Sequence, residues 1–170
     1  MCNDVVRNYL PCSSPSTPVK SRYCRVTCNK LKHDFRHAII SILRLIRPGQ
    51  HLPIQAVLDG KRLRRTYSIC SGLGDWPLEI GVRVQPGGRF SEFVANELAV
   101  GDELHVMPPT GRFHANIDSG ESKFYLGFAA GSGITPILSI TKSILENEPG
   151  SRFALFYGNR KQRSTMFIDD

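Results

Sequence analysis

The sequence lacks the long apolar segment of a membrane protein and the opening pattern of a secreted one. No apolar run in its 170 residues approaches the roughly 20 residues that a membrane-spanning helix requires. Residues 1–19, MCNDVVRNYLPCSSPSTPV, do not show the basic-then-apolar order of a secretory signal. These absences predict a cytoplasmic protein without a membrane partner.

Cysteine is scarce, and the spacing of the cysteines does not indicate a disulfide framework. The five cysteines form an odd and scattered set, which does not suit the disulfide pattern of a small secreted domain. Cys24 and Cys28 are a close pair, but no second pair or histidine follows at zinc-finger spacing. We therefore expect reduced thiols and no metal site.

Acidic residues are outnumbered by basic ones. The chain has 22 Lys and Arg against 15 Asp and Glu, a net charge of +7 that suits nucleic acid, a phosphate-rich cofactor or an acidic protein. Much of the charge lies in KSRYCRVTCNKLKHDFRH and GKRLRR, which also resemble strands and a turn. A basic helix and the aromatic pattern of an RNA-binding sheet are both missing. Solvated strand edges explain the charge better than nucleic-acid binding does.

The first two thirds of the chain have the pattern of an all-β domain after a short arm. Residues 1–18 are rich in Ser, Pro and Asn without a sustained period, which predicts a flexible N-terminal arm. In residues 19–115 short strand-like segments alternate with turns, and Asp59–Gly60 is the strongest hairpin signal. One helix is expected after Ser91 as its N-cap, with Gly101 as its stop. An antiparallel barrel or sandwich follows, with strands over residues 22–28, 38–44, 52–58, 64–70, 78–84 and 103–107.

The pattern changes after the polar segment 116–122, where we expect a domain boundary. Residues 124–130 are a continuous apolar run, as in a strand buried on both faces. Residues 134–145 have helical spacing, residues 152–157 form a second apolar strand, and residues 164–170 could start another helix. A strand, a crossover helix and a strand are the minimal parallel unit. Residues 116–170 therefore predict the beginning of an α/β domain.

The segment AAGSGITP joins the first apolar strand to the helix. Gly131 and Gly133 permit tight backbone angles and close approach by a ligand, and the N-terminus of the helix suits a pyrophosphate. Pro136 fits an early helical position, where its missing N–H costs little. The segment is neither a P-loop nor the six-residue dinucleotide fingerprint. Taken alone, it is explained equally well by a tight structural turn.

Two further motifs lie in the β-rich part. RRTYSICS concentrates a cation, a planar ring and a hydroxyl in Arg65, Tyr67 and Ser68, and strand alternation places Ser68 on the opposite face from the other two. PGGRFSEFV offers a glycine pair before a helix start, a second place for an anion. Considered alone, RRTYSICS is better explained by an ordinary strand with an exposed arginine and a half-buried tyrosine, and PGGRFSEFV is explained equally well by a glycine turn with an ordinary serine cap.

In their order and spacing these motifs resemble the ferredoxin–NADP reductase superfamily of flavoproteins. RTYS is similar to its flavin motif, GGRFS to the loop that holds the FAD pyrophosphate, and AAGSGITP to its nicotinamide-nucleotide loop; PPTGRF and YGNR also fall in family order. The resemblance covers roughly residues 19–170 and looks closest to the reductase subunits of multicomponent oxygenases. It implies a Greek-key FAD-binding barrel over residues 19–115 and an incomplete NAD(P)-binding domain over residues 116–170.

The resemblance also implies roles for particular residues. Tyr67 would stack on the isoalloxazine ring and Ser68 would hydrogen-bond near the flavin N5 that accepts hydride, so these two are the expected catalytic residues. The other expected FAD contacts are Arg65, Thr66, Gly88, Arg89, Phe90 and Ser91, together with Val82 and Arg83 through their backbone. The expected nicotinamide-nucleotide contacts are Gly131, Gly133, Thr135 and Pro136. Arg160 or Arg163 would meet a 2′-phosphate, which favours NADPH over NADH.

The chain departs from the family in two respects. Its nucleotide-binding segment has only part of the family's parallel sheet, which favours a fragment of a longer reductase. It also lacks a C-x₄-C-x₂-C run, so no iron–sulfur cluster is expected in this chain. The expected function is an FAD-dependent oxidoreductase that takes hydride from NAD(P)H and passes electrons to an iron–sulfur domain or oxygenase component. The alternative is a truncated FAD-binding module without turnover.

Overall fold

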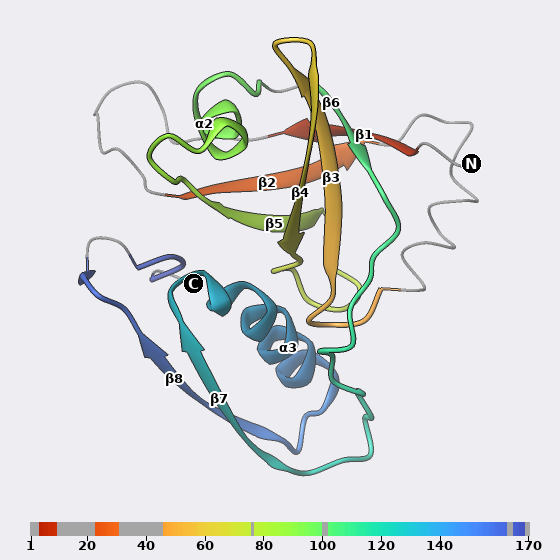
Figure 1. Ribbon diagram of the computed structural model, residues 1–170. Coiled ribbons are helices and arrows are strands. Elements are labelled where there is room, and N and C mark those ends of the chain that lie inside the picture. Colours follow the sequence, from red (N-terminus) through yellow and green to blue (C-terminus); the bar gives the residue numbers. More distant parts are fainter. Residues whose placement is uncertain are drawn as a thin grey trace.

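A computed structural model describes residues 4–9, 23–30, 46–75, 77–99, 102–162 and 165–168, and for residues 4–9 and 23–30 it describes the backbone alone. Figure 1 shows an antiparallel sheet joined to a smaller parallel unit. The elements are β1 (Asp4–Tyr9), β2 (Tyr23–Lys30), β3 (His51–Leu58), β4 (Lys61–Ser68), β5 (Leu78–Arg83), α2 (Arg89–Asn96), β6 (Glu103–Val106), β7 (Phe124–Ala130), the 3₁₀ turn η2 (Gly131–Gly133), α3 (Ile134–Asn147) and β8 (Arg152–Gly158). The strand expected over residues 38–44 lies outside the described residues.

The antiparallel sheet has the strand order β4-β3-β6-β1-β2-β5. Its β3–β4 hairpin turns at Asp59 and Gly60, whose φ angles of 48° and 71° are both positive, as the hairpin signal predicts. The edge strands β4 and β5 meet through an isolated bridge between Ile69 and Ile80, so no continuous ladder closes the described sheet into a barrel. The predicted order of an antiparallel domain followed by a parallel unit is confirmed.

The first strand corrects the prediction of a flexible arm over residues 1–18. β1 occupies Asp4–Tyr9 in the middle of the sheet and pairs antiparallel with both β6 and β2. Val5 and Val6 are β-branched residues that favour a strand, but the surrounding Ser- and Pro-rich sequence conceals them. Its partners lie far away in the chain, so no local pattern could identify the pairing.

The helix α2 begins earlier than expected and is capped differently. Its N-cap is Gly88 and not Ser91, which lies inside the first turn. The Ser91 hydroxyl accepts a hydrogen bond from the Gln85 N–H and donates one to the Gly88 carbonyl, both at 3.0 Å. The hydroxyl thus holds the preceding turn together. The helix ends at Asn96, and the expected stop at Gly101 lies outside the described residues.

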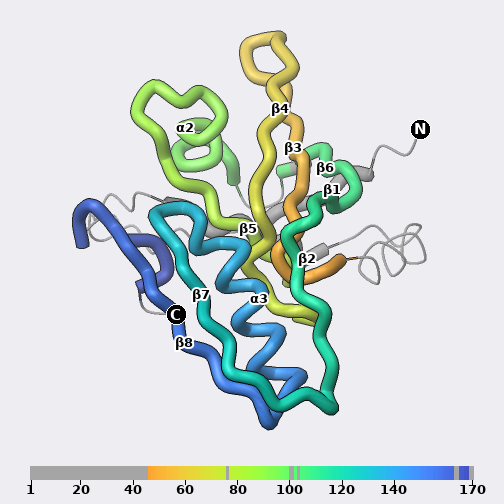
Figure 2. The backbone as a smooth tube through the Cα atoms, turned by 60° about the horizontal axis from the view of Figure 1, so that its bottom comes forward, coloured from red at the N-terminus to blue at the C-terminus, as the bar shows by residue number. Residues whose placement is uncertain are grey.

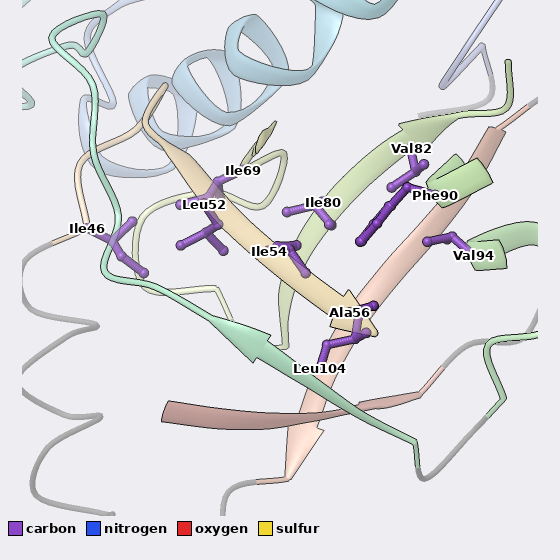
Figure 3. Close-up of a cluster of buried hydrophobic side chains, with 10 residues drawn as sticks. All are labelled: Ile46, Leu52, Ile54, Ala56, Ile69, Ile80, Val82, Phe90, Val94 and Leu104. Carbon is purple, nitrogen blue, oxygen red and sulfur yellow. The ribbon is translucent and has the colours of Figure 1, made fainter. Parts of the chain in front are cut away.

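The core of the antiparallel domain lies between the sheet and α2. Alternate residues of β3, namely Leu52, Ile54 and Ala56, point inward, as the period of two along a strand requires. Figure 3 shows these side chains converging with others from β5, α2 and β6. The full buried cluster is Ile46, Leu52, Ile54, Ala56, Ile69, Ile80, Val82, Phe90, Val94 and Leu104.

The parallel unit consists of β7 and β8 with α3 on one face. Figures 1 and 2 show α3 between this strand pair and the antiparallel domain. The opposite face exposes Phe124, Leu126, Phe128 and Phe156, which are 56–69% exposed. The prediction that β7 is buried on both faces is therefore wrong for the described chain, because α3 covers only one of them. Residues 165–168 form a turn and not the expected helix.

A buried carboxylate joins the ends of this unit. Glu148 is 1% exposed and accepts hydrogen bonds from the Asp118 N–H at 3.1 Å, the Tyr125 hydroxyl at 2.9 Å and the Ser151 hydroxyl at 2.8 Å. Burial acts to raise the pKa of Glu148, but the hydrogen bonds from Asp118, Ser151 and Tyr125 outweigh it, and the pKa lies below its ordinary value. The ionised carboxylate thus connects β7, α3 and the start of β8.

None of the helices in the described part of the chain has the length and apolar character needed to cross a membrane.

Candidate cofactor cleft

A cleft of about 340 Å³ lies where the antiparallel domain meets the start of α3. Its volume falls within the range of roughly 300–1,000 Å³ that small-molecule sites occupy. The end of β4, the strand β5, the turn before α2 and the first turn of α3 all contribute to it. The lining residues are Arg65, Thr66, Tyr67, Ser68, Gly81, Arg83, Gln85, Gly88, Phe90, Ser91, Ser132 and Thr135.

The end of β4 contributes four successive residues, from Arg65 to Ser68. Strand alternation predicts Ser68 on the opposite face from Arg65 and Tyr67. The structure nevertheless brings all of them to one cleft at the end of β4, which is an edge strand of the sheet. A cation, a phenol ring and two hydroxyls therefore lie along one wall.

Tyr67 provides the flat surface of this wall. Burial raises the pKa of its phenol above the ordinary value, while the charge of Arg65 acts in the opposite direction. The phenol therefore stays neutral at physiological pH. Its ring lies against that of Phe90, with centroids 5.9 Å apart and an interplanar angle of 33°. A ring held in this way can stack on a planar ligand.

The turn before α2 forms the second wall. A Cβ atom at Gly88 would lie 2.7 Å from the Ser91 hydroxyl oxygen, so the turn requires glycine there. Arg89 does not line the cleft: its guanidinium pairs with the Asp59 carboxylate and donates to the Leu58 carbonyl at 3.2 Å. At the predicted pyrophosphate site the groups near the cleft are therefore the backbone of the turn and Ser91. The charged group of Arg89 lies against the β3–β4 hairpin instead.

The glycine-rich turn forms the third wall. Gly131 has a φ of +54°, a conformation that favours glycine, and its carbonyl accepts a hydrogen bond of 2.8 Å from the Tyr157 hydroxyl. Gly133 is the N-cap of α3, and no atom lies within 4 Å of the position that its Cβ would occupy. Thr135 donates to the Ser132 carbonyl at 2.9 Å. The Ile134 N–H bonds back to the Gly131 and Ser132 carbonyls, and Ser132 and Gly133 are exposed. This wall therefore offers an anionic ligand the positive end of a 14-residue helix.

Arg83 lies between the second and third walls. Its guanidinium nitrogen Nη1 is 3.2 Å from the position of a Cβ at Gly131. This strand residue from the antiparallel domain therefore reaches the turn of the parallel unit. Its charge can face the phosphates of a ligand that extends from one unit to the other.

The structure brings most of the predicted residues together and separates the others. Nine of them line the cleft: Arg65, Thr66, Tyr67, Ser68, Arg83, Gly88, Phe90, Ser91 and Thr135. The predicted residues outside its lining are Val82, Arg89, Gly131, Gly133, Pro136 and Arg160. Val82 points into the core, and Arg160 is exposed after β8. Arg163 lies outside the described residues.

Gly81, Gln85 and Ser132 line the cleft without having been predicted. Each is a near neighbour of a motif residue in sequence, and this adjacency was the available signal. Together the walls offer a neutral aromatic ring, cationic side chains and an open helix N-terminus. This combination fits a cofactor with a flat ring system and a pyrophosphate, such as FAD, beside a second phosphate-bearing nucleotide.

Two family models match the chain. The oxidoreductase FAD-binding domain matches residues 28–115, and the oxidoreductase NAD-binding domain matches residues 128–170. The first match includes the strands β3 to β6 and the helix α2. It therefore includes the two walls of the cleft that the end of β4 and the turn before α2 form. The second begins within β7 and includes the glycine-rich turn.

Two similar proteins are named as parts of larger enzyme systems. The chain is 45% identical over 121 residues to a subunit of the 1,2-phenylacetyl-CoA epoxidase of Escherichia coli, and the match covers 71% of the chain and 34% of that protein. It is 37% identical over 124 residues to the ferredoxin reductase component of 3-ketosteroid-9-alpha-monooxygenase of Mycobacterium tuberculosis, over 72% of the chain and 34% of that protein. The chain thus spans about a third of the length of these relatives.

The fold has close counterparts among solved structures. Ferredoxin-NADP+ reductase from Plasmodium falciparum with 2'P-AMP superposes with a TM-score of 0.75 at 18% identity, over 98% of this chain and 66% of that one. Phthalate dioxygenase reductase superposes with a TM-score of 0.64 at 23% identity, over 98% and 46%. At these identities the likeness shows the fold alone. The family match over residues 28–115 shows more: the chain belongs to the oxidoreductase FAD-binding domain family.

Proposed function

We propose that the chain binds FAD in the cleft, takes hydride from NAD(P)H and passes electrons to an iron–sulfur domain or an oxygenase component. The relatives that are named as ferredoxin reductase components of oxygenase systems support this proposal. FAD, when bound, accepts two electrons as hydride and can release them singly. The protein's own contribution is to bind and orient the two nucleotides.

The observation that carries the proposal is the composition of the cleft. Tyr67 and Ser68, at the end of β4, share it with Ser132 and Thr135, at the start of α3. Hydride transfer requires donor and acceptor rings within van der Waals contact, so a flavin subsite and a nicotinamide subsite must adjoin. A cleft shared between the two units meets this requirement.

The positions of individual residues support the following roles. Tyr67 would cover one face of the isoalloxazine ring, and the hydroxyl of Ser68 would donate a hydrogen bond to the reacting edge. Arg65 and the turn held by Ser91 would contact the FAD phosphates. The N-terminus of α3, open at Gly133, would receive the pyrophosphate of the second nucleotide.

Three finer assignments belong to the same proposal. Arg160, exposed on the bend after β8, would meet a 2′-phosphate and favour NADPH. The boundary between the two domains would lie near residues 116–122, between β6 and β7. The protein would act in the cytoplasm, where NAD(P)H is available as reductant.

An anaerobic absorbance titration of the chain with NADPH and with NADH tests the proposal. Flavin bands that bleach would support it, and flavin bands that persist would indicate an FAD-binding module without turnover. The double variant Arg65→Ala, Ser91→Ala should lose flavin. The matched control is Arg62→Ala, an exposed cation of the same strand outside the cleft, which should keep it. Retention of flavin by the double variant would contradict the placement of the site.

A further inference from the structure

Two buried serines of α3 bind the loop that follows β4, the strand that carries Tyr67 and Ser68. The Ser139 hydroxyl donates a hydrogen bond of 2.7 Å to the Ser71 carbonyl. The Ser143 hydroxyl accepts one of 2.8 Å from the Leu73 N–H and donates one of 2.6 Å to the Ser139 carbonyl. We refer to this pair, Ser139 and Ser143, as the serine clamp.

The two serines of the clamp and the loop residue Ser71 are buried. Ser71, Ser139 and Ser143 are 2%, 1% and 0% exposed. Removing the Ser139 hydroxyl would leave the buried Ser71 carbonyl without its partner, which costs more than losing an exposed hydrogen bond. Removing the Ser143 hydroxyl would break the part-buried bond to the N–H of Leu73, a residue that is 36% exposed. The loop and the helix are therefore held in one relative position.

Both sides of the clamp lead directly to the cleft. Ser71 follows Ser68 by three residues, and the intervening backbone is held by bonds of 2.9 Å from the Ile69 N–H to Gln50 and from the Cys70 N–H to Glu79. On the helix side, Thr135 lines the cleft, and Ser139 and Ser143 follow on the same face at intervals of four residues. A shift at the clamp would therefore reach both subsites.

We propose that Ser139 and Ser143 are positioning residues for hydride transfer, which set the distance between the flavin wall on β4 and the nucleotide turn at the start of α3. The inference rests on the proposed function. Neither serine touches the cleft, so they act through the loop and the helix. A displacement of about 1 Å at a reacting centre can cost as much as about 100-fold in rate.

The test uses the FAD-loaded chain and the single variants Ser139→Ala and Ser143→Ala. We expect flavin content to be unchanged and the rate of flavin reduction at saturating NADPH to fall about tenfold, with a smaller change in KM. The long-wavelength charge-transfer absorbance of nicotinamide against flavin should weaken. Amide exchange at Leu73 should quicken in Ser143→Ala, because its acceptor is lost.

Thr141→Ala is the matched control. Its hydroxyl donates to the Ile137 carbonyl within the same helix at 2.8 Å and makes no bond to the loop, so its removal should leave all of these readouts unchanged. Serine variants that are reduced at the parent rate, with the parent charge-transfer band, would overturn the positioning role alone. A parent chain that holds FAD but is not reduced by either nucleotide would overturn the proposed function and the positioning role together.

Discussion

Gly81 lies at a close contact between the two units, and its replacement by alanine tests that contact directly. A Cβ atom there would lie 2.7 Å from Cζ of Phe167 and 2.8 Å from Cγ2 of Thr135. Both neighbours are buried, at 7% and 4% exposure. Neither can move away into solvent, so the strand β5 and the start of α3 must separate.

The cost follows from the overlap. Forcing an extra methyl group into a packed interior costs roughly 1–3 kcal/mol. For a chain of this length each kcal/mol lowers the melting temperature by about 2–4 °C, so we expect a loss of about 2–12 °C. Urea denaturation of Gly81→Ala should show a lower midpoint with an unchanged slope. Because Gly81 also lines the cleft, FAD retention should weaken.

Gly133→Ala is the matched control for this prediction. Its Cβ would meet no atom within 4 Å, and its φ of −65° is allowed to alanine. A poorer N-cap and a smaller loss of backbone entropy offset each other, so its stability should change by less than about 1 kcal/mol. Its binding of NADPH should weaken, since the open space is where the pyrophosphate would approach. If Gly81→Ala kept parent stability, or if both variants lost it equally, the reasoning from local packing would be refuted.

Three further predictions concern the parallel unit. The stability that ionised Glu148 contributes is present above its ordinary pKa of 4.5 and is lost as the pH falls through its lower folded-state pKa. The urea midpoint of Glu148→Gln should therefore fall less steeply than that of the parent between about pH 5 and 3. Parallel curves for the two proteins would contradict this. Tyr157→Phe removes the hydroxyl that donates to the Gly131 carbonyl, so it should destabilise the chain by about 1–2 kcal/mol. It should also weaken NADPH binding while the flavin content stays unchanged. An unchanged NADPH affinity in a titration would exclude this role. Phe128→Thr removes a ring that stacks on Phe156 on the exposed face of the strand pair, with ring centroids 5.0 Å apart. Sedimentation should show less self-association of the variant, while its free energy of unfolding changes by about 1 kcal/mol or less. Undiminished self-association would show that this face is not the contact between copies.

Local patterns predicted the elements whose signals lie within the element itself. The apolar run at 124–130 and the helical spacing from Ile134 match β7 and α3 in position. The turn at Asp59–Gly60 needs two positive φ angles, and these two residue types tolerate them better than most. The motifs around Tyr67 and Gly131 were recognisable because the residue types that suit rings and phosphates are adjacent in sequence.

Features that depend on distant partners could not be predicted in this way. β1 exists because β6 and β2 flank it, and Arg89 turns from the cleft because the Asp59 carboxylate lies within its reach. That residues of β4, the turn before α2 and the start of α3 line one cleft depends on the packing of the two units, which no sequence period encodes.

The order of an antiparallel domain and a parallel unit, together with the glycines and aromatic residues of the cofactor motifs, is already visible in the amino-acid sequence, because backbone freedom and hydrophobic period act over a few residues. The folded chain alone reveals that Ser139 and Ser143 bind the loop after β4. It alone also reveals that residue 81 must lack a side chain because Thr135 packs against it. These contacts join residues more than fifty positions apart, and their energies depend on burial and on distance, which exist only once the chain has folded.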